Sequence, residues 1–302
     1  MSASTRSLTL KKVLTNVVQT EPSIMSRNRF LPNPSSVSLE SMIPRNPKAQ
    51  RELLGNILIS SNHEWDERTL QDMDLIWSIE KKDKIENGSI VSWKKLPVQA
   101  SISRQNKDND TRDTNISIWK GDITLLDAEA ITNAANDQGL GCFVPNHRCI
   151  DNVIHRSAGP RLRHSCKRVM QDRGYPLSAG TEPIITPAFY LPSQHVIHVT
   201  GPQISYRSNG EVTNKDREQL KKAYQGSLDL CAKHNIRSIA FCGISTGIFG
   251  FPKDIACSIA ITTVLDWLQL NSNHEMDSII FDVFSEEEEI MYNQTLKQIM
   301  NS

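Results

Sequence analysis

The stretch IRSIAFCGISTGIFGFP, residues 236–252, joins a short apolar segment to a glycine-rich loop. The segment IRSIAFC has the length and the Ile and Phe content of a buried strand. Three glycines follow it, and apolar side chains then recur at helical spacing from Ile255 to Trp267. A strand, a glycine loop and a helix in this order are typical of an α/β protein, in which ligands bind at the carboxyl ends of the strands.

The glycine loop itself, GISTGIFGFP at residues 243–252, has the composition of a phosphate-binding loop. Glycine permits the backbone angles that turn successive N–H groups toward one point, and the positive end of a helix follows. Ser245 and Thr246 add hydroxyl groups, and Phe249 can stack on a ribose or a base. The GK[ST] ending of a Walker loop is absent. A glycine-rich connection that binds no ligand is the alternative.

The alternation of strands and helices extends over residues 116–302. Strands are indicated at 116–119, 129–132, 195–202 and 278–284, and helices around 150–158 and 220–231. Ser285 and Glu288 have the spacing of a capping box, which predicts a terminal helix. The whole pattern predicts a three-layer α/β/α domain with a mixed sheet.

The N-terminal part of the chain has a different composition. Residues 1–48 contain seven basic and two acidic residues, which agrees with a disordered tail and also with a mitochondrial transit peptide. Apolar stripes at 53–58 and 70–77 predict two short helices, in an N-terminal helical extension over 49–100. The polar stretch 101–115 has no aromatic residue and is interpreted as a linker.

Charge and cysteine content argue against several classes of protein. The 302 residues carry 34 basic and 34 acidic side chains, so nucleic-acid binding through bulk positive charge is not expected. No run of eighteen apolar residues is present, and no membrane span is expected. Six cysteines in so long a chain do not indicate a disulfide-stabilised miniprotein, which favours a reducing compartment. The cytoplasm is therefore expected, with mitochondria left open by the basic N-terminus.

Two further loops follow strands where a ligand site is expected. In GDIT, residues 121–124, Asp122 is either a turn residue or an acceptor for an exocyclic amine or a ribose hydroxyl. In NAAN, residues 133–136, small residues let the backbone come close to a ligand, and the two asparagine amides can hold ribose hydroxyls or a water. Asp and Asn are also common in turns that bind nothing.

The segment CFVPNHRC, residues 142–149, brings Cys142, His147 and Cys149 close together in the sequence. Thiolate and imidazole ligands suit zinc, and three protein ligands with one open position are typical of a catalytic zinc site. Asp151 follows at the start of a predicted helix, where its carboxylate can hold a water or a ribose hydroxyl near the metal. Two buried cysteines and a surface histidine are the alternative.

Taken in order, these segments resemble the macrodomain family. The resemblance rests on GDITLLDAEAITNAAN, GCFVPNHRCIDNVIHRSAGPRLRHSC and SIAFCGISTGIFGFP, and it covers roughly residues 49–300. The segment CFVPNHRC stands where zinc-free relatives carry a glycine-rich loop. In this respect the chain is similar to the zinc-containing macrodomains that act as protein-ADP-ribose hydrolases, which also carry an N-terminal helical extension.

The resemblance implies an ADP-ribose site along the loops. Asp122 would accept the adenine amino group beside the backbone amide of Ile123. The distal ribose would face Asn136, with Asn133 beside it in the same site. The residues that would wrap the diphosphate and the distal ribose are Ser245, Thr246, Gly247, Ile248 and Phe249.

The resemblance also implies the reaction. Cys142, His147 and Cys149 would hold Zn²⁺, and Asp151 would position the attacking water or a ribose hydroxyl. The substrate would be a protein carrying a single ADP-ribose on an acidic side chain, and a sirtuin-type ADP-ribosyltransferase would be a candidate partner. A module that binds ADP-ribose without cleaving anything is the alternative, although such a reader would not require the metal ligands beside Asp151.

Overall fold

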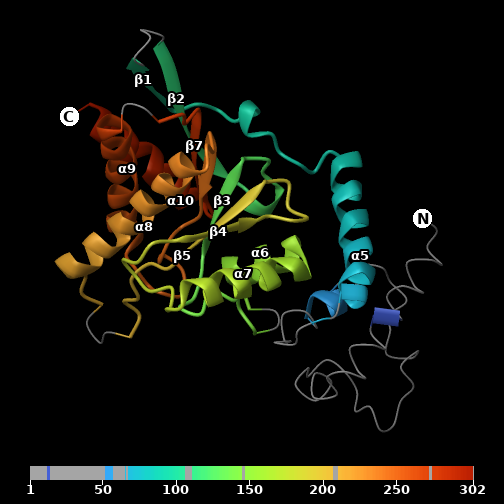
Figure 1. Ribbon diagram of the computed structural model, residues 1–302. Coiled ribbons are helices and arrows are strands. Elements are labelled where there is room, and N and C mark those ends of the chain that lie inside the picture. Colours follow the sequence, from blue (N-terminus) through green and yellow to red (C-terminus); the bar gives the residue numbers. More distant parts are fainter. Residues whose placement is uncertain are drawn as a thin grey trace.

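The computed structural model describes residues 12–13, 52–56, 65, 67–105, 111–144, 147–206, 210–271 and 274–301. Its strands are β1 (Ala100–Gln105), β2 (Thr111–Lys120), β3 (Ala130–Ala134), β4 (Ile184–Pro187), β5 (His195–Val199), β6 (Ser238–Phe241) and β7 (Ser278–Val283). They form one sheet in the order β1-β2-β7-β6-β3-β5-β4 (Figure 1). The five inner strands run parallel, and both edge strands are antiparallel to their neighbours. The prediction of a mixed sheet is confirmed.

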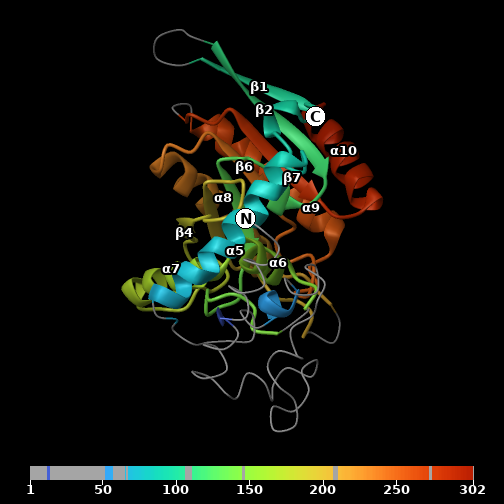
Figure 2. The same ribbon diagram turned by 90° about the vertical axis from the view of Figure 1, so that its right-hand side faces the viewer.

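Helices cover both faces of this sheet. The helices are α5 (Glu67–Glu86), α6 (Ile150–Ala158), α7 (Pro160–Arg173), α8 (Asn214–Lys233), α9 (Lys253–Leu270) and α10 (Glu286–Met300). Helices α8, α9 and α10 pack against one another on one face, and α6 and α7 lie together on the other (Figures 1 and 2). The predicted capping box of Ser285 and Glu288 begins α10. The three-layer α/β/α prediction is therefore confirmed.

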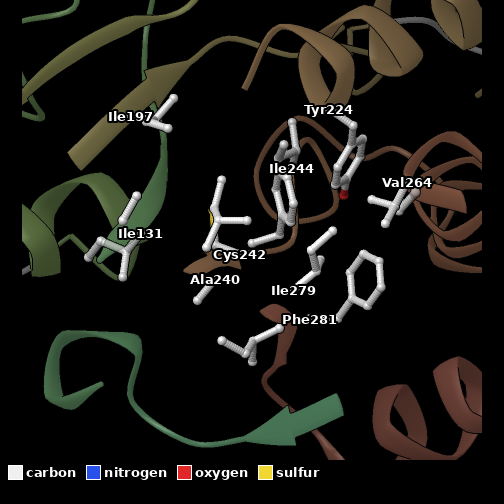
Figure 3. Close-up of a cluster of buried hydrophobic side chains, with 14 of the residues drawn as sticks. Ile131, Ile197, Tyr224, Ala240, Cys242, Ile244, Val264, Ile279 and Phe281 are labelled. Carbon is white, nitrogen blue, oxygen red and sulfur yellow. The ribbon is translucent and has the colours of Figure 1, made fainter. Parts of the chain in front are cut away.

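The central strands are buried on both faces, which explains why their sequences are continuous apolar runs. Every residue of β6 is buried. Aromatic side chains link this strand to its neighbours: the ring centroids of Phe241 and Tyr224 lie 5.1 Å apart, and those of Phe241 and Phe281 lie 6.2 Å apart. Figure 3 shows Tyr224 and Phe281 within this buried cluster. This core holds the carboxyl ends of the strands, and the loops that follow them, in fixed relative positions.

The interpretation of residues 101–115 as a linker is wrong for the described part of that stretch. Residues 100–105 form β1, and β2 begins at Thr111, so the sheet starts before the predicted boundary at 116. The two strands pair from Ala100↔Ile116 to Gln105↔Thr111. Their side chains are polar because β1 is an exposed edge, where hydroxyls can pair across the strands, as Ser101 Oγ does with Asn115 Oδ1 at 2.7 Å. Among the side chains of β1 that the structure describes, only Ala100 and Ile102 pack against the core, and an apolar alternation of two residues is too short to mark a strand in a sequence.

The N-terminal extension packs through a small apolar cluster of its own. The cluster is formed by Val13, Leu53, Leu54, Trp65, Leu70, Met73 and Trp77. Residues 52–56 are helical, and α5 continues past the predicted end of the second helix to Glu86. Ile57 and Leu58 of the first predicted stripe lie outside the described residues, as does most of 1–48. No helix in the described part of the chain is long and apolar enough to cross a membrane.

Polar contacts fasten α5 to the body of the domain. Trp77 Nε1 donates to the carbonyl oxygen of Arg156 at 3.0 Å, at the end of α6. Lys81 Nζ donates to the carbonyl oxygen of Leu191 at 2.8 Å. An ion pair joins Arg161 Nη2 on α7 to Glu67 Oε1 at 2.7 Å. Helix α5 therefore supports the junction of α6 and α7, and Figure 2 shows it lying across these two helices.

Candidate functional site

The loops singled out in the sequence all follow parallel strands and therefore lie along one edge of the sheet. GDIT follows β2, NAAN completes and follows β3, and the glycine loop follows β6. Two strands, β7 and β6, separate β2 from β3. With neighbouring strands about 4.8 Å apart, the GDIT and NAAN loops are about 14 Å apart, with the glycine loop between them. This row of loops suits an elongated ligand with a different chemical group at each position.

At one end of the row, Asp122 begins the short 3-10 helix η2 (Ile123–Leu125). Its Oδ1 accepts hydrogen bonds from the backbone N–H of Thr124 at 2.9 Å and from Thr124 Oγ1 at 2.7 Å. One carboxylate oxygen of Asp122 therefore stabilises the turn, which is one of the two roles that the sequence predicted for this residue. The charge of Asp122 also acts on Asp282, at the end of β7. Burial, together with the nearby charges of Asp122 and Glu288, raises the pKa of Asp282 to about 8.

In the middle of the row, the glycine loop has an unusual backbone. Ser245 has a φ of 65°, in the left-handed region, and the loop is closed by a hydrogen bond from the N–H of Phe251 to the carbonyl oxygen of Ser245 at 3.0 Å. The N–H groups of residues 246–249 donate to no backbone acceptor among the residues that the structure describes. Gly247 and Ile248 are exposed. Free N–H groups on an exposed loop, directly before the N-terminus of α9, are the features that bind phosphate.

At the other end of the row, the three candidate metal ligands converge. Cys142 Sγ lies 3.3 Å from His147 Nδ1, and the donor atoms of Cys142, His147 and Cys149 all lie within 4.8 Å of one another. All three side chains are half-buried. Cys149 is the N-cap of α6, where its Sγ accepts from the N–H of Asn152 at 3.4 Å. The structure therefore brings together the three residues that the sequence singled out.

The thiol of Cys149 is held in its protonated form unless a cation lies beside it. Burial raises the pKa of Cys149 to about 12, and the neighbouring Cys142 adds to the rise. Two thiolates and an imidazole form a donor set that zinc prefers, and a divalent ion would stabilise both thiolates at once. The cluster fits a zinc ion in its number, type and proximity of donor atoms.

Arg163, on α7, holds the first ligand of this cluster. Its Nη2 donates to the carbonyl oxygen of Cys142 at 3.2 Å, and its guanidinium lies 4.0 Å from the ring centroid of Phe143. Burial lowers the pKa of Arg163 to about 10, and its charge in turn favours the ionised form of Asp151. Sequence reasoning missed this residue, because nothing in a basic helical segment shows which arginine turns inward.

Asp151 lies in the first turn of α6, two residues beyond Cys149, and is buried. Its Oδ1 accepts from Asn133 Nδ2, at the end of β3, at 2.7 Å. Burial raises the pKa of Asp151 to about 6, while the hydrogen bond from Asn133 and the charge of Arg163 oppose that rise. The carboxyl group is therefore held between β3 and the segment of the three candidate ligands (142–149, here called the metal-ligand loop), with a pKa of about 6.

The two asparagines of NAAN have different partners. Asn133 is fully buried and contacts Asp151, as described. Asn136 Nδ2 donates to the carbonyl oxygen of Gly141 at 3.1 Å, and Asn136 Oδ1 accepts from the N–H of Gly139 at 3.1 Å. Asn136 thus shapes the loop that leads into Cys142. Its contact with a ribose remains a prediction.

Two histidines that the sequence did not single out, His155 and His198, are buried beside Asp151. His155 Nε2 lies 3.5 Å from Asp151 Oδ1, one helical turn away, and His198 on β5 contacts Asn133. Burial holds the pKa of His155 well below its usual range, so the ring is neutral and its contact with Asp151 is not an ion pair. The four-residue spacing between Asp151 and His155 was the available signal for the first histidine. For His198, no spacing in the sequence indicated that it would lie near Asp151.

Comparison with known proteins agrees with this arrangement. A family model described as "Macro domain" matches residues 132–260. A protein-ADP-ribose hydrolase of Treponema medium is 46% identical over 179 residues, which are 59% of this chain and 66% of that protein. The chain therefore spans just under two thirds of the length of this relative. A protein-ADP-ribose hydrolase of Staphylococcus aureus is 38% identical over 184 residues, which are 61% of this chain and 67% of that protein.

A solved structure shows the same fold. The Oceanobacillus iheyensis macrodomain with ADP is 32% identical in sequence, with a TM-score of 0.55, over 67% of this chain and 97% of that one. The fold, the order of the loops and these relatives lead to one conclusion: the chain belongs to the macrodomain family.

Proposed function

We propose that this macrodomain is a zinc-dependent protein-ADP-ribose hydrolase that removes a single ADP-ribose from an acidic side chain. The observation that carries the proposal is the position of Asp151, two residues from Cys149 at the start of α6, where the three metal-ligating side chains converge. A module that only bound ADP-ribose would have no use for this cluster. The relatives named protein-ADP-ribose hydrolase support the same reaction.

The ligand would lie along the row of loops. Its adenine would reach Asp122, whose second carboxylate oxygen can accept from the exocyclic amine. Its diphosphate would meet the free N–H groups of 246–249, and its distal ribose would lie near Asp151. The separation of about 14 Å between the GDIT and NAAN loops matches an extended nucleoside diphosphate that ends in a sugar.

Cys142, His147 and Cys149 would hold the zinc ion. When bound, zinc acts as a Lewis acid that polarises a coordinated oxygen and lowers its pKa. Arg163 and Asn136 keep the loop that carries Cys142 in place, through the carbonyl oxygens of Cys142 and Gly141.

Asp151 would act on the attacking water. A carboxyl group with a pKa near 6 is ionised at neutral pH and can accept a proton as the water attacks. Asn133 aims the carboxylate, and Arg163 favours its ionised form. Water attacks either the anomeric carbon of the distal ribose or the ester carbonyl, and the C–O bond to that carbon breaks. The products are free ADP-ribose, a free carboxylate on the protein, and one proton, which Asp151 passes to solvent.

The test is release of ADP-ribose from a protein mono-ADP-ribosylated on Asp or Glu, by the purified chain loaded with zinc. We expect release by the wild type, and a fall of about 100-fold or more for Asp151→Asn and for Cys142→Ala, with ADP-ribose binding retained in calorimetry. Asp172→Asn, on the exposed face of α7, is the matched control and should behave as wild type. Binding without release by the wild type would show a reader and refute the proposal. Equal turnover by Cys142→Ala would refute the role of the metal.

A further inference from the structure

A second set of polar residues lies behind Asp151, inside the sheet. His198 is the fourth of the five residues of β5 and Thr186 is on β4, and both are buried, with 0% and 1% of their surface exposed. His198 is the direct cross-strand neighbour of Asn133 in the parallel pairing of β3 and β5. Side chains of direct neighbours leave the sheet on the same face, so the imidazole lies beside the amide that contacts Asp151. Buried polar residues in a central strand are costly unless each finds a partner.

The contacts form a continuous chain from the sheet to Asp151. Asn133 Nδ2 lies 2.7 Å from Asp151 Oδ1 and 3.0 Å from His198 Nδ1. His198 Nε2 lies 3.0 Å from Thr186 Oγ1. The four residues come from α6, β3, β5 and β4, so the chain of contacts crosses three neighbouring strands.

Chemistry decides the direction of each hydrogen bond. An amide oxygen placed 2.7 Å from the Asp151 carboxylate would be repelled, so the amide nitrogen of Asn133 must face Asp151, as found. The second hydrogen of this nitrogen points to His198 Nδ1, which must then be an unprotonated acceptor. A neutral imidazole with a free Nδ1 carries its proton on Nε2, which donates to Thr186 Oγ1. Burial lowers the pKa of His198 to about 3, in agreement with a neutral ring.

We propose that His198 and Thr186 are positioning residues for Asp151: through the tautomer of His198 they hold the amide of Asn133 in the orientation that aims the Asp151 carboxylate. This proposal rests on the proposed hydrolase function of Asp151. If His198 carried its proton on Nδ1 instead, Asn133 would turn its oxygen toward the imidazole to accept that proton. The amide nitrogen would then leave the position from which it donates to Asp151.

The same region contains His155, Cys166 and His198, whose nitrogen and sulfur atoms lie within 4.8 Å of one another. A buried metal ion could be held by such a trio. However, both ring nitrogens of His198 already have partners at 3.0 Å, while Cys166 Sγ is more distant, at 3.5 Å. The hydrogen-bonded chain uses both nitrogens of His198, so it and a metal at His198 exclude each other.

Two substitutions of His198 separate a positioning role from a packing role. In His198→Asn the side-chain oxygen takes the place of Nδ1 and can still accept from Asn133. In His198→Gln the amide reaches the place of Nε2 beside Thr186, but no acceptor remains for Asn133. We expect kcat of His198→Asn within about threefold of wild type, and a fall of about 10- to 100-fold for His198→Gln, with KM and ADP-ribose affinity unchanged in both. Equal losses in the two variants would show that His198 only fills space, and would overturn the proposal.

The protonation site of the His198 ring can be measured directly, without any assay of turnover. The ¹⁵N spectrum of the imidazole should show His198 protonated on Nε2 in the wild type, and Thr186→Val should weaken this preference while Thr186→Ser keeps it. A wild-type ring protonated on Nδ1 overturns the proposal, as does a second equivalent of bound zinc that is lost in Cys166→Ser. If the wild type releases no ADP-ribose, the hydrolase function fails, while the ¹⁵N spectrum still decides the orientation of Asn133.

Discussion

Replacement of Arg163 by methionine should weaken zinc binding without unfolding the domain. Methionine keeps the apolar stem of the side chain but loses the contacts of the guanidinium with this segment. Among them are the hydrogen bond to the carbonyl oxygen of Cys142 at 3.2 Å and the contact with the Phe143 ring at 4.0 Å. A hydrogen bond from a charged donor contributes about 1.5–3 kcal/mol, and a cation–π contact about 1 kcal/mol. Together these two contacts stabilise the segment that carries Cys142 by about 2.5–4 kcal/mol, which the variant loses.

Only part of this loss should appear in the metal affinity, because bound zinc itself restores order to the segment. We expect the zinc dissociation constant to rise about 10- to 100-fold, which corresponds to about 1.4–2.7 kcal/mol. The measurement is competition with a chromophoric chelator at fixed pH, together with the melting temperature of the metal-free protein. Arg163→Lys keeps the charge but not the planar group, so most of the effect should remain.

The control is Arg168→Met, on the exposed side of the same helix, which should bind zinc as the wild type does. A folded Arg163→Met protein with wild-type zinc affinity would refute the reasoning. In that case Arg163 would stabilise the domain without acting on the metal-ligand loop.

Three further substitutions probe the supports of the site. Trp77→Phe removes the indole N–H that donates to the carbonyl oxygen of Arg156, and should lower the free energy of unfolding in urea by about 1 kcal/mol. Asp282→Asn should stabilise the protein by about 1–3 kcal/mol at pH 9 and have little effect near pH 4. Burial raises the pKa of Asp282 to about 8, so its ionisation costs stability progressively as the pH rises toward that value. In Gly201→Ala the new methyl group would meet the hydroxyl of Ser245 in the glycine loop. Calorimetry should therefore show weaker binding of ADP-ribose, and urea denaturation should show a free energy of unfolding lower by about 1–3 kcal/mol.

The parallel core of the fold could be predicted because its signals are local. Each central strand is a short apolar run, and the helices after β6 and β7 begin where the sequence indicates. The prediction failed where the apolar pattern is absent. Strand β1 is a polar edge, and β4, at 184–187, is short and ends in proline. Helix α7 contains five basic residues and a histidine in PRLRHSCKRVMQDR, so its buried stripe is hard to recognise.

The residues of the candidate site also fall into two groups, those that the sequence could predict and those that it could not. Cys142, His147, Cys149 and Asp151 lie within ten residues of one another, so their convergence was visible in the sequence. The role of Arg163 was not visible, because it depends on the way α7 packs against the metal-ligand loop. Zinc binding, the acidic linkage, a sirtuin-type partner and the cellular compartment remain predictions.

The histidine in β5 shows why local reasoning fails behind an active site. The sequence HVIHVTGP indicates a buried strand, and nothing in it distinguishes a histidine that fills space from one that orients a neighbour. The difference arises only when β3 and β5 pair in a register that sets Asn133 beside His198, because the amide then supplies the hydrogen bond that the buried ring requires. The same amide must also satisfy Asp151, so the cost of burying a polar ring in the sheet and the need to aim a carboxylate are met by one set of hydrogen bonds. An apolar residue at 198 would remove that cost and leave the strand intact, so the reason for a histidine at this position lies in the site and not in the sheet.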